Sequence, residues 1–509
     1  MTPMQMKTLD EETISKYGIP SILLMEHAAY NVFKHIKMNN MHQNIVIVCG
    51  PGNNGGDGFA LARQIKIWSE HGIKILMVTE PDQLSHDGKV YYNICKQLSI
   101  EIVQIVANNT QIARDELRGA DTIIDALFGT GLSRTVQGIY AEIIAAINES
   151  LAYTISIDIP SGIDGKTGKV QGICVQAEKT ITFTLPKMGL YVYPAIDFIG
   201  ELEIVDIGVP KELVREIQTS FYTIDKQEMK QLLPKRPTRS NKGTYGKVLI
   251  IGGQTGMSGA VTLTSTAALK AGAGIVTAAV PKAIHDIMEQ KLTEVMTIPL
   301  EDKEGHISEG AIKQIKELIS KYDVIAVGPG IGRSKESEAV LLTVLESDKP
   351  CIIDADALYF LRGMLELLRV RSGATIITPH PGEMARLIDL PLSAVLDTPI
   401  ELTHQFAKEN NVTTVLKIER TVVGDEQGNI YINKGGNSGM AKGGSGDLLT
   451  GIIAGLLAQS MEASGAARLG VYLHARAADI MKTLKSEFTI LPTDLYEGMD
   501  KAFKEMMDT

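Results

Sequence analysis

A stretch dense in glycine and asparagine, GPGNNGGDG at residues 50–58, directly follows an apolar run at residues 45–48. Gly50, Gly52 and Gly55 fit the spacing GxGxxG of dinucleotide-binding turns, which is weak evidence when it stands alone. The P-loop pattern is excluded because no Lys-Ser or Lys-Thr pair follows the glycines. The density of glycines favours close approach of the backbone to an anion at a helix N-terminus. The alternative is a tight strand-to-helix turn without a ligand.

Two further loops with polar side chains follow apolar runs in the first half of the chain. ALFGTGLSRT (126–135) comes after TIID, and IPSGIDGKTG (159–168) comes after TISID. Ligands bind beyond the carboxyl ends of the strands in an open parallel sheet, so we expect all three loops at one edge. The polar side chains gathered there would be Asn53, Asn54, Asp57, Asp125, Asp158 and Ser161. The competing interpretation is that Asp125 and Asp158 only cap helices or brace loops.

The second half contains a glycine-rich turn, GGSGD at residues 443–447, that leads straight into the apolar segment 448–458. The free amides of such a turn can bind an anion, with support from the helix dipole. Asp447 suits the deprotonation of an alcohol that attacks a phosphoryl group, and the alternative role is an N-cap. His380, between two prolines in TPHPGEMARL (378–387), is a candidate ligand, although a single histidine is more often structural.

These loops require strands that alternate with helices along the chain. Short apolar runs typical of buried parallel strands lie at 45–48, 73–78, 122–125 and 154–158. A polar and basic stretch at 225–246 interrupts this alternation. Similar runs then follow at 247–253, 274–280, 324–328, 351–355, 375–379, 413–417 and 421–425. We therefore expect two doubly wound α/β domains, at residues 1–224 and 225–509.

The bulk composition bounds the class of protein. The chain has 509 residues, a net charge of −10 and a hydrophobic content of 44%, as in a soluble protein of roughly two to four domains. The acidic charge disfavours nucleic-acid binding. Four scattered cysteines without a CxxC pair are typical of reduced core residues, and the longest apolar stretch is too short to span a bilayer. We expect a cytoplasmic homo-oligomer that binds small molecules, without a nucleic-acid or membrane partner.

Across almost all of residues 1–222 the sequence resembles the NAD(P)H-hydrate epimerase domain, on the motifs GPGNNGGDG, DALFGTGLSR, DIPSGID and TFTLPKMGL. The resemblance implies a Rossmann-like domain whose loops hold the damaged cofactor. The implied contacts are Asn53, Asn54, Gly55, Gly56, Asp57, Gly129, Thr130, Gly131, Leu132, Ser133, Arg134, Thr135 and Asp158. It also implies a potassium ion held by Asn54, Asp125 and Ser161.

The implied reaction is inversion at carbon 6 of the hydrated nicotinamide ring. The ring nitrogen can expel hydroxide to give an iminium ion, and water can return on the other face. Asp125, Asp158 or Lys187 could move the proton, and the residues alone do not choose among the three.

Residues 235–495 resemble the NAD(P)H-hydrate dehydratases, a ribokinase-like family, on KVLIIGG, VGPGIG, IDADAL, TPHPGEMARL and GGSGD. The resemblance implies that Ala260, Gly330 and His380 contact the hydrate and that Asp447 meets its hydroxyl. The implied nucleotide contacts are Lys417, Ile418, Glu419, Arg420, Thr421 and Gly446. Ile418 replaces a family glycine, and Lys442 replaces a threonine beside the anion hole.

The implied chemistry is phosphorylation of the ring hydroxyl by ADP, with ATP as the alternative donor, followed by elimination of phosphate. Magnesium is expected to screen the donor phosphates. The products would be NAD(P)H, AMP and phosphate, and the substrates would be the hydrates of NADH and NADPH. Two alternatives stay open: a small-molecule kinase with an appended binding domain, and a first domain that is a non-catalytic scaffold.

Overall fold

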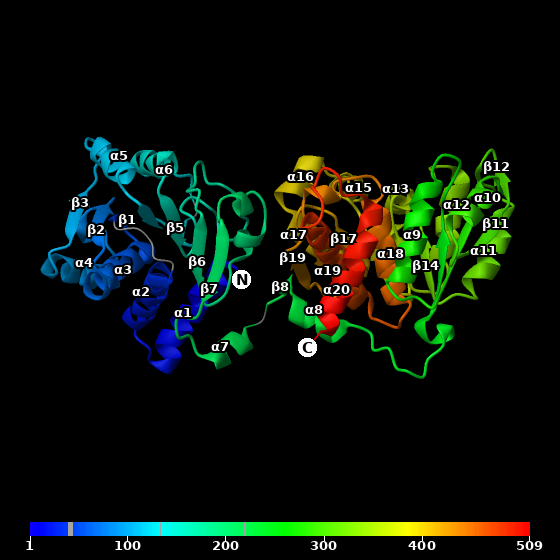
Figure 1. Cartoon of the computed structure of the whole chain (residues 1–509), viewed down its shortest axis with the longest axis horizontal. Coiled ribbons are helices and arrows are strands. Elements are labelled where there is room, and N and C mark those ends of the chain that lie inside the picture. Colours follow the sequence, from blue (N-terminus) through cyan, green and yellow to red (C-terminus); the bar gives the residue numbers. More distant parts are fainter. Residues whose placement is uncertain (39–43, 133, 218, 509) are drawn as a thin grey trace. The chain divides into compact units, whose positions relative to one another are not determined.

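The computed structural model describes residues 1–38, 44–132, 134–217 and 219–508. They form two compact units that divide between Thr219 and Ser220 (Figure 1), and each unit is built on its own large sheet. Within these described ranges, no helix combines the length and the apolar character needed to cross a membrane.

The first unit contains a seven-stranded sheet in which all neighbouring strands are parallel, in the order β3-β2-β1-β4-β5-β6-β7. The strands are β1 (Asn44–Cys49), β2 (Gly72–Met77), β3 (Glu101–Gln104), β4 (Thr122–Ala126), β5 (Tyr153–Ile157), β6 (Lys179–Phe183) and β7 (Glu201–Val205). The four strands expected from apolar runs are confirmed. β3, β6 and β7 were not predicted, because charged or polar residues leave each of them with only a short apolar run.

Helices cover both faces of this sheet because alternate residues of each strand point to opposite sides. The helices are α1 (Pro3–Tyr17), α2 (Ser21–Met38), α3 (Asn53–Trp68), α4 (His86–Gln97), α5 (Thr110–Arg118), α6 (Ile139–Glu149) and α7 (Lys211–Glu216), with short 3₁₀ turns η1 (Pro81–Gln83), η2 (Met188–Tyr191) and η3 (Ala195–Asp197). Ile45 and Ile47 of β1 pack in a core with α1, α2, α3, α4 and α7. Val46 and Val48 pack in a second core with α5 and α6.

The second unit contains a ten-stranded sheet in the order β11-β10-β9-β14-β15-β16-β17-β18-β19-β8. The strands are β8 (Phe221–Ile224), β9 (Lys247–Ile251), β10 (Ile275–Pro281), β11 (Met296–Leu300), β14 (Val324–Val327), β15 (Cys351–Ile353), β16 (Thr375–Ile377), β17 (Thr413–Leu416), β18 (Val422–Gly424) and β19 (Ile430–Asn433), beside a separate hairpin of β12 (Asp302–Lys303) and β13 (His306–Ile307). Pairing is antiparallel only around β18.

The apolar segment expected to be a buried helix is α18 (Ser445–Leu457), which packs with the neighbouring helices in one large core. The other helices are α8 (Lys226–Leu232), α9 (Ser258–Lys270), α10 (Lys282–Lys291), α11 (Ala311–Ile319), α12 (Lys335–Leu345), α13 (Asp356–Leu361), α14 (Leu365–Val370), α15 (Pro381–Ile388), α16 (Leu392–Asp397), α17 (Pro399–Asn410), α19 (Ala463–Lys482) and α20 (Leu495–Met507). Short 3₁₀ turns are η4 (Lys242–Tyr245), η5 (Arg362–Met364), η6 (Ser438–Met440) and η7 (Pro492–Asp494).

The boundary between the units falls a few residues before the expected position at residue 225. The reason is β8, which pairs in parallel with β19 and so belongs to the second sheet. Tyr222 of β8 stacks on Tyr431 with ring centroids 5.3 Å apart, and Ile224 is buried. The four residues of β8 are too short a run to stand out in the sequence.

Both sheets have a switch point, where the strand order runs outward in two directions from one strand, β1 in the first sheet and β9 in the second. In the first unit it lies between β1 and β4, and a Cβ at Gly50 would lie 1.9 Å from the Leu127 carbonyl oxygen. In the second unit it lies between β9 and β14, and a Cβ at Gly252 would lie 2.3 Å from the Pro329 carbonyl oxygen. Only glycine allows the two loops of each switch point to meet this closely.

Candidate active sites

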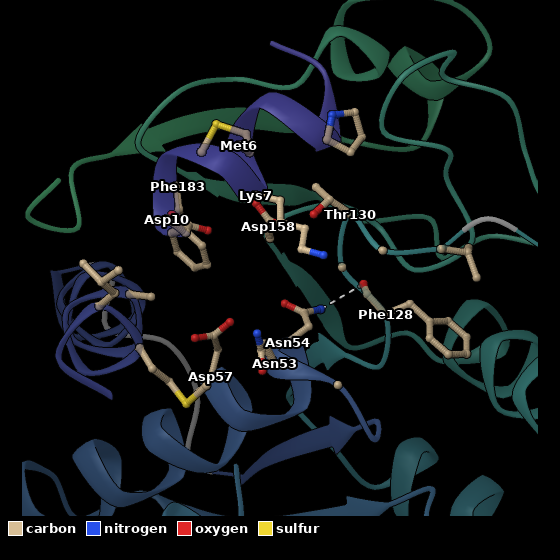
Figure 2. A pocket seen from close by; sticks show the side chains of 18 of the residues that line it. Met6, Lys7, Asp10, Asn53, Asn54, Asp57, Phe128, Thr130, Asp158 and Phe183 are labelled. Atoms are coloured by element: carbon tan, nitrogen blue, oxygen red, sulfur yellow. Dashed lines mark hydrogen bonds between the residues drawn. The ribbon is translucent and has the colours of Figure 1, made fainter. Parts of the chain in front are cut away.

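A cavity of about 870 Å³ opens in the first unit beside the loops that follow β1, β4 and β5. Figure 2 shows that its walls come from α1, from the start of α3 and from these loops. The three glycine-rich loops expected at one sheet edge are therefore brought together, with Asn53, Asn54, Asp57 and Asp158 in the lining.

Gly55 and Gly56 of NNGGDG, which were expected to contact a ligand, contribute instead to helix packing. α3 begins at Asn53, so Gly55 and Gly56 are buried in its first turns and do not line the cavity. A Cβ at Gly55 would lie 2.0 Å from the Gly50 carbonyl oxygen, and one at Gly56 would lie 2.6 Å from the Met25 side chain. These two glycines let α3 pack closely on its neighbours, while Asn53, Asn54 and Asp57 face the cavity.

The loop after β4 supplies much of the expected second wall. The expected residues of this loop that line the cavity are Gly129, Thr130, Gly131, Leu132 and Arg134, and Leu127 and Phe128 line it as well. Thr135 does not line the cavity and instead packs near Gly172. Ser133 lies outside the described residues.

Asp125 lies beneath the cavity and is fully buried. Its carboxylate accepts hydrogen bonds from Ser156 Oγ at 2.8 Å and from the amide and hydroxyl of Ser161 at 2.8 and 2.5 Å. Burial raises the pKa of Asp125, and this effect outweighs the hydrogen bonds, which lower it. Because the group does not line the cavity and is held by the protein, the geometry does not support Asp125 as the proton carrier of the reaction.

The three residues expected to hold potassium do lie together. Asn54 Nδ2 donates to the Phe128 carbonyl at 2.9 Å, and Ser161 Oγ, which donates to Asp125, lies 3.2 Å from the same carbonyl oxygen. Asn54 Oδ1 is buried without a hydrogen-bond partner. A buried oxygen acceptor rarely lacks a partner, and a set of neutral and carboxylate oxygens suits a hard cation.

Asp158 and Lys187 form an ion pair in the cavity wall. Lys187 Nζ lies 2.5 Å from Asp158 Oδ1 and also donates to Thr182 Oγ1 at 3.0 Å. Asp158 adopts a left-handed backbone conformation, with φ of 68°, which for a non-glycine residue is often found at functional sites. Lys187 is buried and lines the cavity.

Sequence reasoning missed the contribution of α1 to this site. Pro3, Met4, Met6, Lys7, Asp10 and Ile14 of this helix line the cavity. The helix begins with a capping box of Thr2 and Gln5 and has proline in its first turn. These N-terminal signals were readable in the sequence. Burial raises the pKa of Asp10 to about 6 and raises that of Asp57 well above its usual range.

In the second unit, GGSGD forms the turn into α18, with Gly444 at φ of 94°. Asp447 lies in the first helical turn, where burial and the nearby Asp354 raise its pKa to about 6. Lys442, expected beside the anion hole, is partly buried. Its ammonium donates to the carbonyl oxygens of Phe488 and Ile490 at 2.7 and 2.5 Å, which ties this loop to the segment before α20.

Lys417 follows β17 and places a cation at the start of α18. A Cβ at Gly446 would lie 3.2 Å from Lys417 Nζ. The ammonium donates to Asp354 Oδ1 at 2.8 Å, and Thr450 Oγ1 donates to Asp354 Oδ2 at 2.7 Å. Asp354 lies in the motif IDADAL, but its role was not predicted. The ammonium and the free amides at the start of the helix have the charge and the donors that suit an anion.

His380 is the N-cap of α15, and its Nδ1 accepts from the Gly382 amide at 3.0 Å. The neutral ring must then carry its proton on Nε2. Burial lowers the pKa of His380, and 57% of the side chain is exposed. Nε2 lies 3.5 Å from Glu383 Oε1, so the N–H of the neutral ring is close to this carboxylate.

The other predicted residues of this half lie around the same strand ends. Gly330, with φ of 64°, approaches Ala260 of α9, because its Cβ would lie 3.3 Å from the Ala260 Cβ. Thr264 of α9 donates to the Asp447 carbonyl at 3.0 Å and so links α9 to α18. Ile418, Glu419, Arg420 and Thr421 form the turn between β17 and β18. The Lys417 amide donates to the Pro379 carbonyl at 2.9 Å, which places this turn beside the His380 loop.

The two folds and their sites define a two-domain α/β protein in which each domain has its own strand-end site. Residues 21–189 match the family model described as YjeF-related protein N-terminus, and residues 248–501 match the model of NAD(P)H-hydrate dehydratase. The second unit is similar to the crystal structure of the ADP/ATP-dependent NAD(P)H-hydrate dehydratase from Bacillus subtilis co-crystallised with ATP and Mg²⁺. That match has a TM-score of 0.50 and 28% identity, over 56% of this chain and 98% of that one.

Full-length relatives extend the match to both units. The chain is 38% identical to the bifunctional NAD(P)H-hydrate repair enzyme of Moorella thermoacetica, over 99% of this chain and 97% of that protein. It is 35% identical to the enzyme of the same description from Coxiella burnetii, over 94% of each. The chain belongs to the family of bifunctional NAD(P)H-hydrate repair enzymes.

Proposed function

We propose that this protein repairs hydrated NADH and NADPH, with the first unit interconverting the R and S hydrates and the second dehydrating the S form. The observation that carries the proposal is that each unit has a complete strand-end site with its own buried carboxylates. This supports catalysis in both units over a non-catalytic first domain. Spontaneous hydration gives both epimers, so an epimerase joined to an S-specific dehydratase would clear the mixture.

In the second unit, Asp447 takes the proton from the ring hydroxyl as this oxygen attacks the donor phosphate. Lys417 and the amides at the start of α18 face the negative charge of the phosphates. Phosphate then leaves carbon 6 with the electron pair of the C–O bond as the nitrogen lone pair forms an iminium ion. Loss of a proton from carbon 5 forms the C5–C6 double bond, returns the lone pair to the nitrogen and so restores the reduced nicotinamide. The donor is ADP or ATP, in keeping with the description of the Bacillus subtilis relative. Magnesium, when bound with the nucleotide, would screen its phosphates.

The test is to incubate the purified protein with a mixture of both hydrates, with and without ADP. We expect the absorbance of reduced nicotinamide to return completely, with release of phosphate, only when nucleotide is present. Without nucleotide, a sample enriched in one epimer should relax to the mixture. A stable phosphorylated alcohol with no regained absorbance would instead identify a small-molecule kinase with an appended domain.

In the first unit, we propose that Asn54, Asp125 and Ser161 hold a potassium ion. The unpartnered Asn54 Oδ1 supports this site. The ion would lie beneath the cavity and supply a fixed positive charge that faces the substrate. Asp125 would contribute negative charge to the ion site and would also hold Ser161 in place. This role differs from proton transfer, which its burial disfavours.

Crystals soaked in thallium, a potassium mimic with strong anomalous scattering, should show a peak in contact with Asn54 Oδ1 and Ser161 Oγ. The Asn54→Leu variant should lack this peak because it removes the orphaned oxygen. A wild-type crystal without a peak between these residues would show that the proposed site is wrong.

A further inference from the structure

Four carboxylates line the cavity of the first unit, and they come from four different elements. One of them, Asp87 of α4, accepts a hydrogen bond from Ser21 Oγ at 2.5 Å. Figure 2 shows Asp10 of α1, Asp57 of α3 and Asp158 after β5 around the same space. They differ in their partners: Asp158 is paired with Lys187, whereas Asp10 Oδ1 is buried with no hydrogen-bond partner. A buried acceptor that the protein itself leaves unpaired costs free energy, so its retention calls for an explanation.

The reaction proposed for this site needs two proton transfers. The bond from carbon 6 to oxygen breaks with its electron pair on the oxygen, which takes a proton from an acid and leaves as water. The nitrogen lone pair forms the iminium ion. Water then attacks carbon 6 from the other face, gives its proton to a base, and the nitrogen regains its lone pair. Atoms and electrons balance without an oxidant or reductant.

One group cannot easily serve both faces of the ring, so the cavity should hold a proton carrier in addition to the Asp158–Lys187 pair. We propose that Asp10 is a catalytic residue of the epimerase site and transfers a proton to or from the oxygen at carbon 6. This inference rests on the proposed epimerase function. It makes α1, which carries none of the glycine-rich motifs, an essential wall of the site.

The electrostatic surroundings of Asp10 support the assignment. The cavity is lined by further charged residues, namely Lys7 on the same helix, Asp57 of α3, Asp87 of α4, and Asp158 and Lys187 from the strand ends. With a pKa of about 6, Asp10 exists in both protonation states near neutral pH, which suits a group that must both give and accept a proton.

The test uses the full chain with Asp10→Asn, which preserves the shape of the side chain. We expect epimerisation, followed by chromatography of the R and S forms without nucleotide, to fall by about 10²–10⁴-fold. Dehydration of pure S hydrate with ADP should be unchanged because it belongs to the second unit, and an unchanged thermal unfolding profile would show that the first unit is folded. Glu12→Gln is the matched control, because Glu12 is an exposed carboxylate on the same helix, and it should epimerise at the wild-type rate.

Two readouts separate proton transfer from a structural role. The wild-type rate should show an inflection near pH 6 that is lost in Asp10→Asn, and formate should restore part of the activity of Asp10→Gly. Epimerisation at the wild-type rate in Asp10→Asn would overturn the inference. A slow variant with an unchanged pH profile, together with no formate rescue, would also overturn it. If the wild-type protein itself fails to epimerise, the proposed function of the first unit fails instead.

Discussion

Replacement of Asp447 by asparagine is expected to lower the dehydration rate by about 10²–10⁴-fold, the usual range for loss of a general base. Asp447 lies in the first turn of α18, and a carboxamide of the same shape cannot accept the proton of the attacking hydroxyl. Epimerisation should continue at the wild-type rate, because it belongs to the first unit. The rate of return of nicotinamide absorbance from pure S hydrate with ADP measures the effect.

The pH dependence gives an independent check on Asp447. Burial and Asp354 raise its pKa to about 6, and only the ionised carboxylate can act as a base. The wild-type rate should therefore fall as the pH drops through 6, by about tenfold per unit below it, and level off above it. Asp447→Asn should lack this acidic limb. A variant that dehydrates at near the wild-type rate would remove Asp447 from the mechanism.

The sequence predicted most of the central strands of both sheets because these strands are buried on both faces and form continuous apolar runs. It missed the four edge strands, β3, β7, β8 and β11. It also missed β6 and β19 inside the sheets, where polar residues interrupt the apolar run. Edge strands bury less of their surface, so their sequences show a weaker apolar pattern. The boundary between the units was expected at residue 225 and lies before β8, because this short edge strand was not recognised in the sequence.

The candidate sites were predictable where a motif follows a strand, since parallel strands bring such loops to one edge. Two features of the first site could not be predicted from the sequence, namely the role of two glycines and the position of Asp10. Glycine density could not separate ligand contact from the packing that Gly55 and Gly56 provide, because both need a bare backbone. The place of Asp10 depends on how α1 folds against strand ends that lie far along the chain, which no local pattern encodes.

Replacement of Lys417 is expected to lower the dehydration rate strongly. The contact of Lys417 with Asp354 means that the same replacement also affects stability. Asp354 is almost fully buried, and the Lys417 side chain is 21% exposed. Lys417→Met would leave the Asp354 carboxylate without its cation. Because removal of one partner of a buried pair is strongly destabilising, we expect a loss of about 3 kcal/mol in the free energy of unfolding. A loss of activity in this variant alone could therefore reflect stability.

A double variant separates the two effects. Lys417→Met with Asp354→Asn removes both charges, so most of the lost stability should return, since the amide can still accept from Thr450. The dehydration rate should stay lower by about 10²–10³-fold, because the cation that faces the donor phosphate at the start of α18 is gone. Thermal unfolding and the rate with saturating ADP measure the two quantities on the same samples, and epimerisation serves as the internal control. If the double variant regains the wild-type rate, then Lys417 only offsets the charge of Asp354, and the anion site consists of the helix amides alone.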